Sequence, residues 1–484
     1  MKKIISFLAA AALVFGTGAA LPEGAVLFGE QIEASAEASG TFGDGLVWKL
    51  DNSGTLTISG NGSMGVLDYG IDETNGAIRL KDNRPWGDKR TEITKIVIEE
   101  GVTDVGDYFF GSMYMYPFVF PTVKTVELPS TIRSIGKFAF SYCTQLEQIS
   151  IPEGVTEISQ AAFLGCEKIT DIKLPSTLKT IGESAFGGLG IKSINIPDGV
   201  SILDNAFSST PLESVVIPDS VTELGDAVFS NCKSLKSVTL PKSIKAIPNR
   251  FFANCIMLES IIIPDKVTKI GDSAFSGCES LKTINIPKGA TDVDFQEIFD
   301  NYSDNSGYRL ARLEAVEVDP DNPIYRSVDG VVYDKELTQV IYCPVERKEL
   351  VLPDSITSID RNAFSKYNKL ESLTLPKDFD DYRNLTPLEE IKGLTVYYYN
   401  DCIKENVDEY VVEHEYRLVK IYPLGDADND GKVSVDDVLL IQQKIAGWDV
   451  KIDMAAADLD GDGKLSVSDA LIVQQIIAGW KISV

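Results

Sequence analysis

The sequence predicts a multidomain α+β protein: a solenoid of short strands with a β-rich N-terminal cap, followed by a small all-α domain. Two sequence patterns carry this prediction. Prolines recur about every 23 residues from Pro129 to Pro287, and an aspartate-rich segment, DADNDGKVSVDD at 426–437, returns in similar form at 458–469. The chain has 484 residues, which is more than one ordinary core accommodates, and its 44% apolar and 24% charged residues are typical of folded chains.

The charge balance narrows the possible partners. Lys and Arg number 45 against 72 Asp and Glu, which gives a formal net charge of -27. Nucleic acids and anionic membrane surfaces need positive counter-charge, so we expect neither as a partner. The excess of negative charge instead favours cations as binding partners.

The N-terminus has the features of a secretory signal peptide. Lys2 and Lys3 precede the apolar run 4–15, which is too short to span a bilayer, and small residues follow it. Cleavage after Ala20 or after Ala36, where the sequence reads Ala-Ser-Ala, would remove this segment. We assign residues 1–36 to the signal and expect a secreted, extracellular protein without membrane insertion.

The central part of the chain repeats one pattern. The prolines that mark it are spaced 21 to 23 residues apart: Pro129, Pro152, Pro175, Pro197, Pro218, Pro241, Pro264 and Pro287. In each unit an alternating stretch such as 149–151 predicts a short strand, which the proline ends. Apolar residues such as Val155, Ile158 and Phe163 must be buried, so neighbouring units have to stack and share one continuous core.

These units resemble the leucine-rich repeats of the bacterial BspA-like type, whose pattern is I-P-x-x-V-x-x-I-G-x-x-A-F-x-x-C-x-x-L. The resemblance implies a repeat array over 94–376, with an irregular, hairpin-bearing segment at 291–349 that turns at Asp329-Gly330. It also implies a β-rich cap at 41–93 and a closing cap at 377–422.

Seven cysteines occur, and five of them hold the same place in the repeat, three residues after its phenylalanine: Cys143, Cys166, Cys232, Cys255 and Cys278. Stacking places successive units roughly 5 Å apart, so disulfides or a metal row are within reach. We expect instead a column of small buried apolar side chains. Cys343 and Cys402 lie outside the column and receive no role.

The aspartate-rich segments have the ligand spacing of a calcium loop, D-x-D-x-D-G-x5-D. A hard divalent cation needs roughly six to eight oxygen ligands, and glycine at the sixth position allows the sharp turn. The pattern therefore predicts two Ca2+ sites. Their candidate ligands are Asp426, Asp428, Asp430, Lys432 through its carbonyl, Ser434 and Asp437, and then Asp458, Asp460, Asp462, Lys464, Ser466 and Asp469.

The two loops differ from an ordinary EF-hand. The twelfth position is Asp rather than Glu, Pro423 denies the first loop an entering helix, and only the exiting helices VLLIQQKIAGW and ALIVQQIIAGW are expected. Residues 423–484 closely resemble a type I dockerin. The resemblance implies docking to a cohesin module of a scaffoldin, in a cellulosome-like assembly, through Val435, Asp436, Gln442, Gln443, Val467, Ser468, Gln474 and Gln475.

The sequence of the array contains no motif that specifies a ligand or a reaction. The chain's one histidine, His414, lies in the closing cap, so a His-based triad or zinc site within the repeats is excluded by composition. We expect no catalytic residues and a binding or adhesion role toward a protein or polysaccharide. The alternative is an enzyme or protease inhibitor acting on such substrates in the same assembly.

Two irregular stretches interrupt the repeats. Residues 113–120 are rich in Met, Tyr and Phe, and they either form a contact surface or plug the end of the array. Residues 294–308 are acidic, and we expect a solvated insertion there.

Overall fold

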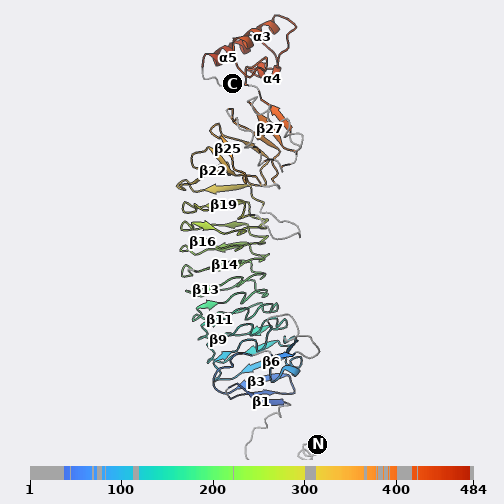
Figure 1. Cartoon of the computed structure of the whole chain (residues 1–484), viewed down its shortest axis with the longest axis vertical. Coiled ribbons are helices and arrows are strands. Elements are labelled where there is room, and N and C mark those ends of the chain that lie inside the picture. Colours follow the sequence, from blue (N-terminus) through green and yellow to red (C-terminus); the bar gives the residue numbers. More distant parts are fainter. Residues whose placement is uncertain are drawn as a thin grey trace, which may run out of the picture.

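The computed structural model is an elongated stack of short strands that ends in a small helical domain (Figure 1). It describes residues 38–479 except 44, 68–69, 73–78, 82, 113–118, 222, 300–311, 365–367, most of 378–392, 400–416 and 422. The predicted fold class is confirmed, because strands build the repeats and the α-helices of the described part lie at the C-terminal end. The predicted signal segment lies outside the described residues.

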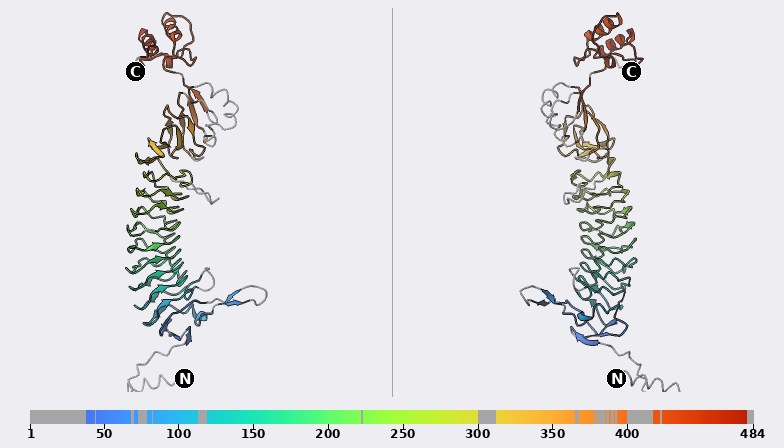
Figure 2. Two further views of the ribbon diagram at one scale, coloured as in Figure 1. Left: turned by 60° about the vertical axis from the view of Figure 1, so that its left-hand side comes forward. Right: turned by 90° about the vertical axis from the view of Figure 1, so that its right-hand side faces the viewer.

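A β-rich cap closes the N-terminal end of the stack. Strands β1 Ala38–Phe42, β2 Leu46–Leu50 and β3 Thr55–Ser59 pair antiparallel, and β3 then pairs in parallel with β6 Lys95–Ile98. A second hairpin, β4 Gly70–Asp72 with β5 Arg79–Lys81, projects from this cap (Figure 2), and the short 3-10 helix η2 spans Gly87–Lys89. Trp48 and Trp86 are buried inside the cap, and Trp86 packs against Phe109 of the array at 6.1 Å, so the cap covers the end of the core.

Parallel strands from successive units run along two sides of the array. One set continues from the cap: β8 Thr125–Glu127, β10 Gln148–Ile149, β14 Ser214–Val216, β15 Ser237–Thr239, β17 Ser260–Ile261, β19 Thr283–Ile286 and β20 Ala315–Val318. The other set comprises β7 Asp104–Val105, β9 Ser134–Ile135, β11 Glu157–Ile158, β12 Thr180–Ile181, β13 Ser201–Ile202, β16 Ala246–Ile247 and β18 Lys269–Ile270. The register pairs equivalent residues, such as Ser214 with Ser237 and Ser237 with Ser260. Each repeat position therefore forms a column.

The repeat phenylalanines form one such column through the core. Their rings stack at centroid distances of 5.4 to 6.1 Å, and all of them are buried: Phe110, Phe140, Phe163, Phe186, Phe207, Phe229, Phe252 and Phe275. Aromatic pairs contribute about 0.5–1.5 kcal/mol beyond the burial of their area. The phenylalanine column thus stabilises stacking of units of the length that the proline spacing indicates.

Each unit also contains a turn that only stacking stabilises. One non-glycine residue per turn has φ between 51° and 56°: Phe138, Ala161, Ser184, Asn205, Ala227, Arg250 and Ser273. This left-handed conformation costs roughly 1–2 kcal/mol per residue. The backbone N–H of each donates to a carbonyl of the next unit, as from Ala161 to Glu183 at 2.7 Å and from Arg250 to Asp272 at 2.8 Å. A single unit lacks that acceptor, so the turns depend on their neighbours.

The irregular segment contains the predicted hairpin. Strands β21 Tyr325–Val328 and β22 Val331–Asp334 pair antiparallel across Asp329 and Gly330, whose φ angles are 50° and 79°, as a type I′ turn requires. Strand β23 Gln339–Tyr342 follows and pairs in parallel with β25 Ser358–Ile359. The stack then continues as β24 Glu349–Val351, β26 Ser372–Thr374, β27 Thr395–Tyr398 and β28 Arg417–Lys420. Parallel pairing therefore extends into the closing cap.

The structure describes part of each irregular stretch, 113–120 and 294–308. In the aromatic stretch Phe120 is buried, packs edge-on against Phe110 at 5.7 Å and lies under the Arg84 guanidinium at 4.8 Å, while 113–118 lie outside the described residues. The prediction of a solvated insertion is wrong for the start of the acidic stretch. Phe295 and Phe299 are buried there, and Phe299 extends the aromatic column beyond Phe275 at 6.4 Å. Ile298, which is also buried, and Phe299 take the place of the repeat's Ala-Phe pair, since the Phe275 N–H donates to the Ile298 carbonyl at 2.9 Å.

The cysteine column is apolar, as predicted. All six described cysteines are free and buried. In the column each thiol donates to the carbonyl of a phenylalanine in the preceding unit, for example Cys255 to Phe229 at 3.1 Å and Cys278 to Phe252 at 3.2 Å. Burial raises the pKa of Cys232 to about 11 and that of Cys143 to about 12, so these thiols stay protonated.

Replacing Cys255 with Ser is expected to destabilise the array by about 1 kcal/mol. The hydroxyl can still donate to the Phe229 carbonyl, but a more polar group is then buried in an apolar column. Urea unfolding of the array measures the change, with the exposed Ser260→Ala as the matched control. An unchanged midpoint in Cys255→Ser would show that the column tolerates polarity.

The C-terminal domain contains three helices, α3 Val435–Ile445, α4 Met454–Ala457 and α5 Val467–Ile477. Helices α3 and α5 follow the two aspartate-rich loops, as the sequence predicts. The sequence did not predict α4, a single turn that Asp453 caps and that ends directly before the second loop. Within the described part of the chain, no helix has the length and apolar character needed to cross a membrane.

Candidate functional site

The first aspartate-rich loop folds around the carboxylate of Asp426. Its Oδ1 accepts the backbone N–H of Asp430 at 3.0 Å, and its Oδ2 accepts that of Gly431 at 2.8 Å. Gly431 has a φ of 93°, so the loop turns there as the sixth position of a calcium loop must. The structure brings carboxylate oxygens of Asp426, Asp428 and Asp437 within 4.8 Å of one another.

The second loop repeats this arrangement thirty-two residues later. Oδ2 of Asp458 accepts the N–H of Gly463 at 2.8 Å, and Gly463 has a φ of 80°. Carboxylate oxygens of Asp458, Asp460 and Asp462 lie within 4.8 Å of one another. The carboxylates of the first and third positions therefore converge in both loops, joined by the twelfth position in the first loop and by the fifth in the second.

The helix that leaves each loop fixes its twelfth residue. Ser434 is the N-cap of α3 and Ser466 that of α5, each in a capping box in which the third helical residue returns a carboxylate to the cap. These carboxylates are Asp437, which accepts from Ser434 N–H at 2.7 Å, and Asp469, which accepts from Ser466 N–H at 2.8 Å. Both are buried. The helix starts thus hold the last carboxylate of each loop.

One carboxylate oxygen of Asp458 indicates that the second loop fits a cation. Oδ1 of Asp458 is buried and has no hydrogen-bond partner. A buried unpaired charge is costly unless a counter-charge meets it, and hard cations prefer carboxylate and carbonyl oxygens. The clustered carboxylates and this orphaned oxygen fit a Ca2+ ion in the second loop, and the cluster of Asp426, Asp428 and Asp437 fits one in the first.

The loop carboxylates are electrostatically unequal. Burial raises the pKa of Asp426, and the nearby carboxylates of Asp437 and Asp430 add to the rise. Burial also acts to raise the pKa of Asp469, but the backbone N–H groups of Ser466 and Leu459 outweigh it and leave that pKa lowered. The Asp426 carboxylate is therefore destabilised by burial and by neighbouring negative charge, and a bound divalent ion offsets both effects.

The predicted ligands at positions seven and nine stay predictions. The N–H groups of Lys432 and Lys464 donate to the fifth-position carboxylates Asp430 and Asp462, each at 2.8 Å. The hydroxyl of Ser434 accepts from the Asp436 N–H at 3.0 Å, and Ser466 does the same in the second half. These contacts place the side chains at the loops without testing coordination.

We expect Asp458→Ala to weaken calcium binding at the second loop, and Asp426→Ala at the first. The loss should be at least the roughly 10- to 100-fold that removal of even an outer-shell partner costs. Calorimetric titration of the full chain with Ca2+ measures both sites, and Asp449→Ala, outside the loops, is the matched control. Two unweakened sites in Asp458→Ala would contradict the assignment.

The predicted docking residues lie on equivalent faces of α3 and α5. Val435 and Val467 are 70% and 74% exposed, and Gln442 and Gln474 are exposed as well. Asp436 and Ser468 are also exposed, while Gln443 and Gln475 are half-buried. The two halves therefore present the same pattern.

Sequence reasoning missed two residues on these faces. Leu439 is 51% exposed and Leu471 is 52% exposed, each one turn after the exposed valine of its helix. Helical spacing from Val435 and Val467 was the available signal. Each helix thus carries an exposed aliphatic pair beside its glutamines.

The protein is thus a strand solenoid that carries a duplicated, carboxylate-lined loop-helix domain. The model of the BspA type leucine rich repeat region matches residues 89–209, 200–305 and 338–386, and that of the dockerin type I domain matches 424–478. The chain belongs to the BspA type leucine rich repeat family and ends in a type I dockerin, a domain type that binds calcium and cohesin. Both are non-catalytic module types.

Solved structures of bacterial leucine-rich repeat proteins are similar to the array. One from Bacteroides ovatus is 23% identical with a TM-score of 0.45, and the match covers 78% of this chain and 98% of that one. A leucine rich cell surface protein from Faecalibacterium prausnitzii is 20% identical with a TM-score of 0.37, over 75% and 95% of the two chains. No curated protein matches the chain.

Proposed function

We propose that this protein is a secreted, non-catalytic binding subunit. Its C-terminal domain docks in a calcium-dependent manner onto a cohesin module of a scaffoldin, and its array presents a surface to a protein or polysaccharide. The observation that carries the docking half is the duplicated loop geometry, with converging carboxylates and the orphaned Asp458 oxygen. The protein is then extracellular and held in a cellulosome-like assembly.

Each loop holds one Ca2+ ion in this proposal. The ligands are the aspartates at the first, third, fifth and twelfth positions, with the Lys432 or Lys464 carbonyl and the Ser434 or Ser466 hydroxyl as further oxygens. The bound ion neutralises the crowded carboxylates, so each loop orders and its exiting helix is fixed in place. Calcium dependence of docking follows, because the docking faces are on those helices.

The docking face combines aliphatic and amide groups. Val435 and Leu439 supply exposed apolar area on α3, and Gln442 supplies a side chain that both donates and accepts hydrogen bonds. Val467, Leu471 and Gln474 repeat the set on α5. A partner that recognises one face can recognise the other.

The array supplies the second binding surface. Its solvent-facing columns repeat a side-chain type from unit to unit, which suits recognition of an extended partner. Among the described residues, the groups of three or more acidic or thiol side chains that are close enough to share an ion are those of the two loops. No observation specifically favours an enzyme or a protease inhibitor over a binding role.

The proposal is tested by incubating the full chain with insoluble plant polysaccharides, soluble glycoproteins and proteases, and measuring both retention and product release. Saturable retention without turnover or inhibition supports the array's binding role. Turnover of a glycan or protein, or inhibition of a protease, would overturn the non-catalytic half. A chain that ends at residue 422 should behave identically, because the array alone carries this activity.

A further inference from the structure

A column of alternating charge runs along one face of the array. It consists of five residues that directly precede strands β14, β15, β17, β19 and β20, together with Lys192, which holds the same place in the unit before β14: Lys192, Glu213, Lys236, Glu259, Lys282 and Glu314. Backbone hydrogen bonds place its members on adjacent units, for instance Lys236 N–H to the Glu213 carbonyl at 2.9 Å and Glu259 N–H to the Lys236 carbonyl at 3.1 Å. The column is neutral in a chain whose net charge is -27.

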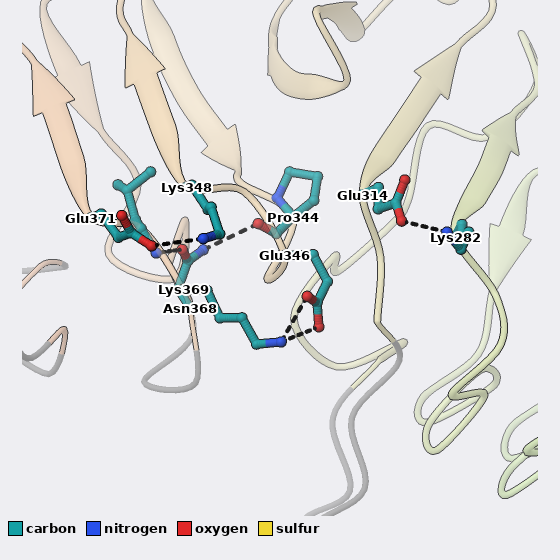
Figure 3. Close-up of polar contacts among 9 residues, drawn as sticks. Lys282, Glu314, Pro344, Glu346, Lys348, Asn368, Lys369 and Glu371 are labelled. Atoms are coloured by element: carbon teal, nitrogen blue, oxygen red, sulfur yellow. Dashed lines mark hydrogen bonds and ion pairs between the residues drawn. The ribbon is translucent and has the colours of Figure 1, made fainter.

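The ends of the column are paired within the chain, but its centre is not. Lys192 contacts Glu213 at 3.2 Å, and Lys282 contacts Glu314 at 2.8 Å. The alternation continues with Lys348 and Glu371, which pair at 3.0 Å (Figure 3). Lys236 and Glu259 are exposed and make no ion pair within the described part of the chain.

An exposed aliphatic strip lies beside these two central residues. Ile262 is 80% exposed and Val216 is 64% exposed, both two residues before the proline of their repeat, and Met257 is 40% exposed. The unit between them has the exposed Thr239 at this position. The first residue of β14, β15 and β17, next to the charge column, is an outward-facing serine in each strand. These small side chains protrude little from the face. The centre of the face is therefore flat, neutral and apolar in part.

Alternating charge in a straight column is self-complementary. A two-fold axis that lies in the plane of the face and crosses the stack between Lys236 and Glu259 reverses the order of units and keeps each column over itself. Lys236 then faces Glu259 of a second copy, Glu213 faces Lys282, and Lys192 faces Glu314. Each of these three opposed pairs has opposite sign, and the strip around Ile262 is covered.

We propose that this face of the array pairs with the same face of a second copy of the chain in antiparallel orientation. Copies of so acidic a chain repel one another over most of their surface, and the neutral column is where that repulsion is weakest. A neutral polysaccharide would gain nothing from the alternation, since the charges need opposite charges to meet. The pairing uses the array alone and does not depend on calcium or docking.

Antiparallel pairing has a consequence for assembly. The C-terminal domain lies at one end of the stack (Figure 1), so two paired copies carry their docking domains at opposite ends. The pair is then bivalent toward cohesin modules, and avidity depends on whether two cohesins span that separation. Pairing thus goes beyond the proposed function, because it sets how many scaffold attachments one particle makes.

The test uses charge reversal at the two central residues. Sedimentation equilibrium of the chain from residue 37 onward, at about 1–100 µM, should show a monomer–dimer equilibrium that weakens with added salt. Lys236→Glu and Glu259→Lys should each weaken pairing by roughly tenfold or more, since each places like charges opposite one another twice. An equimolar mixture of the two variants should pair again, because every central contact then joins Lys to Glu.

Mixing the two variants can restore charge contacts between copies, but it cannot restore contacts within one chain. Recovery of pairing in the mixture therefore shows that the contacts join two copies. Lys245→Glu makes the same charge change on the β16 side and should leave pairing unaltered. A monomer at every concentration, unaltered pairing in Lys236→Glu, or a mixture that stays monomeric would each overturn the proposal. Binding of a soluble neutral glucan that is lost in Ile262→Asp, by a chain that never pairs, would assign the face to polysaccharide instead.

Discussion

Removing calcium is expected to unfold the C-terminal domain while the array stays folded. The loop carboxylates repel one another without a cation, and the core beneath them is small: Ala427, Val438, Ile441, Ala457, Leu459, Ala470 and Val473. A core of this size rarely supplies more than about 3–5 kcal/mol. One ion at a free concentration about 1,000 times its Kd adds ~4 kcal/mol, so loss of two ions exceeds the stability that the core provides.

Circular dichroism of the full chain measures this effect. Within the described residues the α-helices are α3, α4 and α5, so the helical signal reports on the C-terminal domain. It should fall on adding a chelator and return with excess Ca2+, while the array's urea transition stays in place. The helical signal would remain unaltered in chelator if the loops were merely acidic turns. Asp426→Ala together with Asp458→Ala should reproduce the chelated state in the presence of calcium.

Replacing the glutamines on one helix should barely weaken docking, whereas replacing both pairs should weaken it strongly. Gln442 with Gln443 and Gln474 with Gln475 occupy equivalent places on the two faces. If a partner binds in either of two orientations, removing one face costs about a factor of two, which is the loss of half the binding modes. Removing both should cost on the order of 100-fold, or about 3 kcal/mol.

Titration of a cohesin module against the three alanine variants distinguishes the possibilities. Gln148→Ala, an exposed glutamine in the array, is the control and should bind normally. Loss of all binding in one single-helix variant would show that one face does the recognition. The two faces are not identical, since Asp436 in the first half corresponds to Ser468 in the second, and Lys444 corresponds to Ile476. Lys444 also donates to the Val450 carbonyl at 3.1 Å. A difference of a few-fold between the two single-helix variants is compatible with two orientations.

The sequence predicts the array well where its columns are regular. Proline spacing and the repeat phenylalanine specify stacking, because only stacking buries that ring in every unit. The prediction was wrong at 294–299, where acidic neighbours obscured Phe295 and Phe299 and the Ala-Phe signal was missing. Burial there depends on rings in adjacent units, which no local pattern encodes.

The loops were predictable for a different reason. Cation ligands recur at fixed local spacing, so Asp426 and Asp458 identify their loops without knowledge of the tertiary fold. Leu439 and Leu471 were not predicted, because an apolar residue in a helix is ordinarily assigned to the core. In this domain α3 and α5 fully bury one narrow stripe each, and Leu439 and Leu471 lie outside it.

We propose that the calcium-loaded C-terminal domain, and not the array, attaches this protein to its scaffold. Calorimetric titration of the full chain into a cohesin module, first in calcium and then in chelator, measures this attachment. The prediction is saturable binding of one module per chain in calcium, no heat in chelator, recovery with excess calcium, and no binding by a chain that ends at residue 422. Equal affinity in chelator, or undiminished binding by the shortened chain, would contradict it.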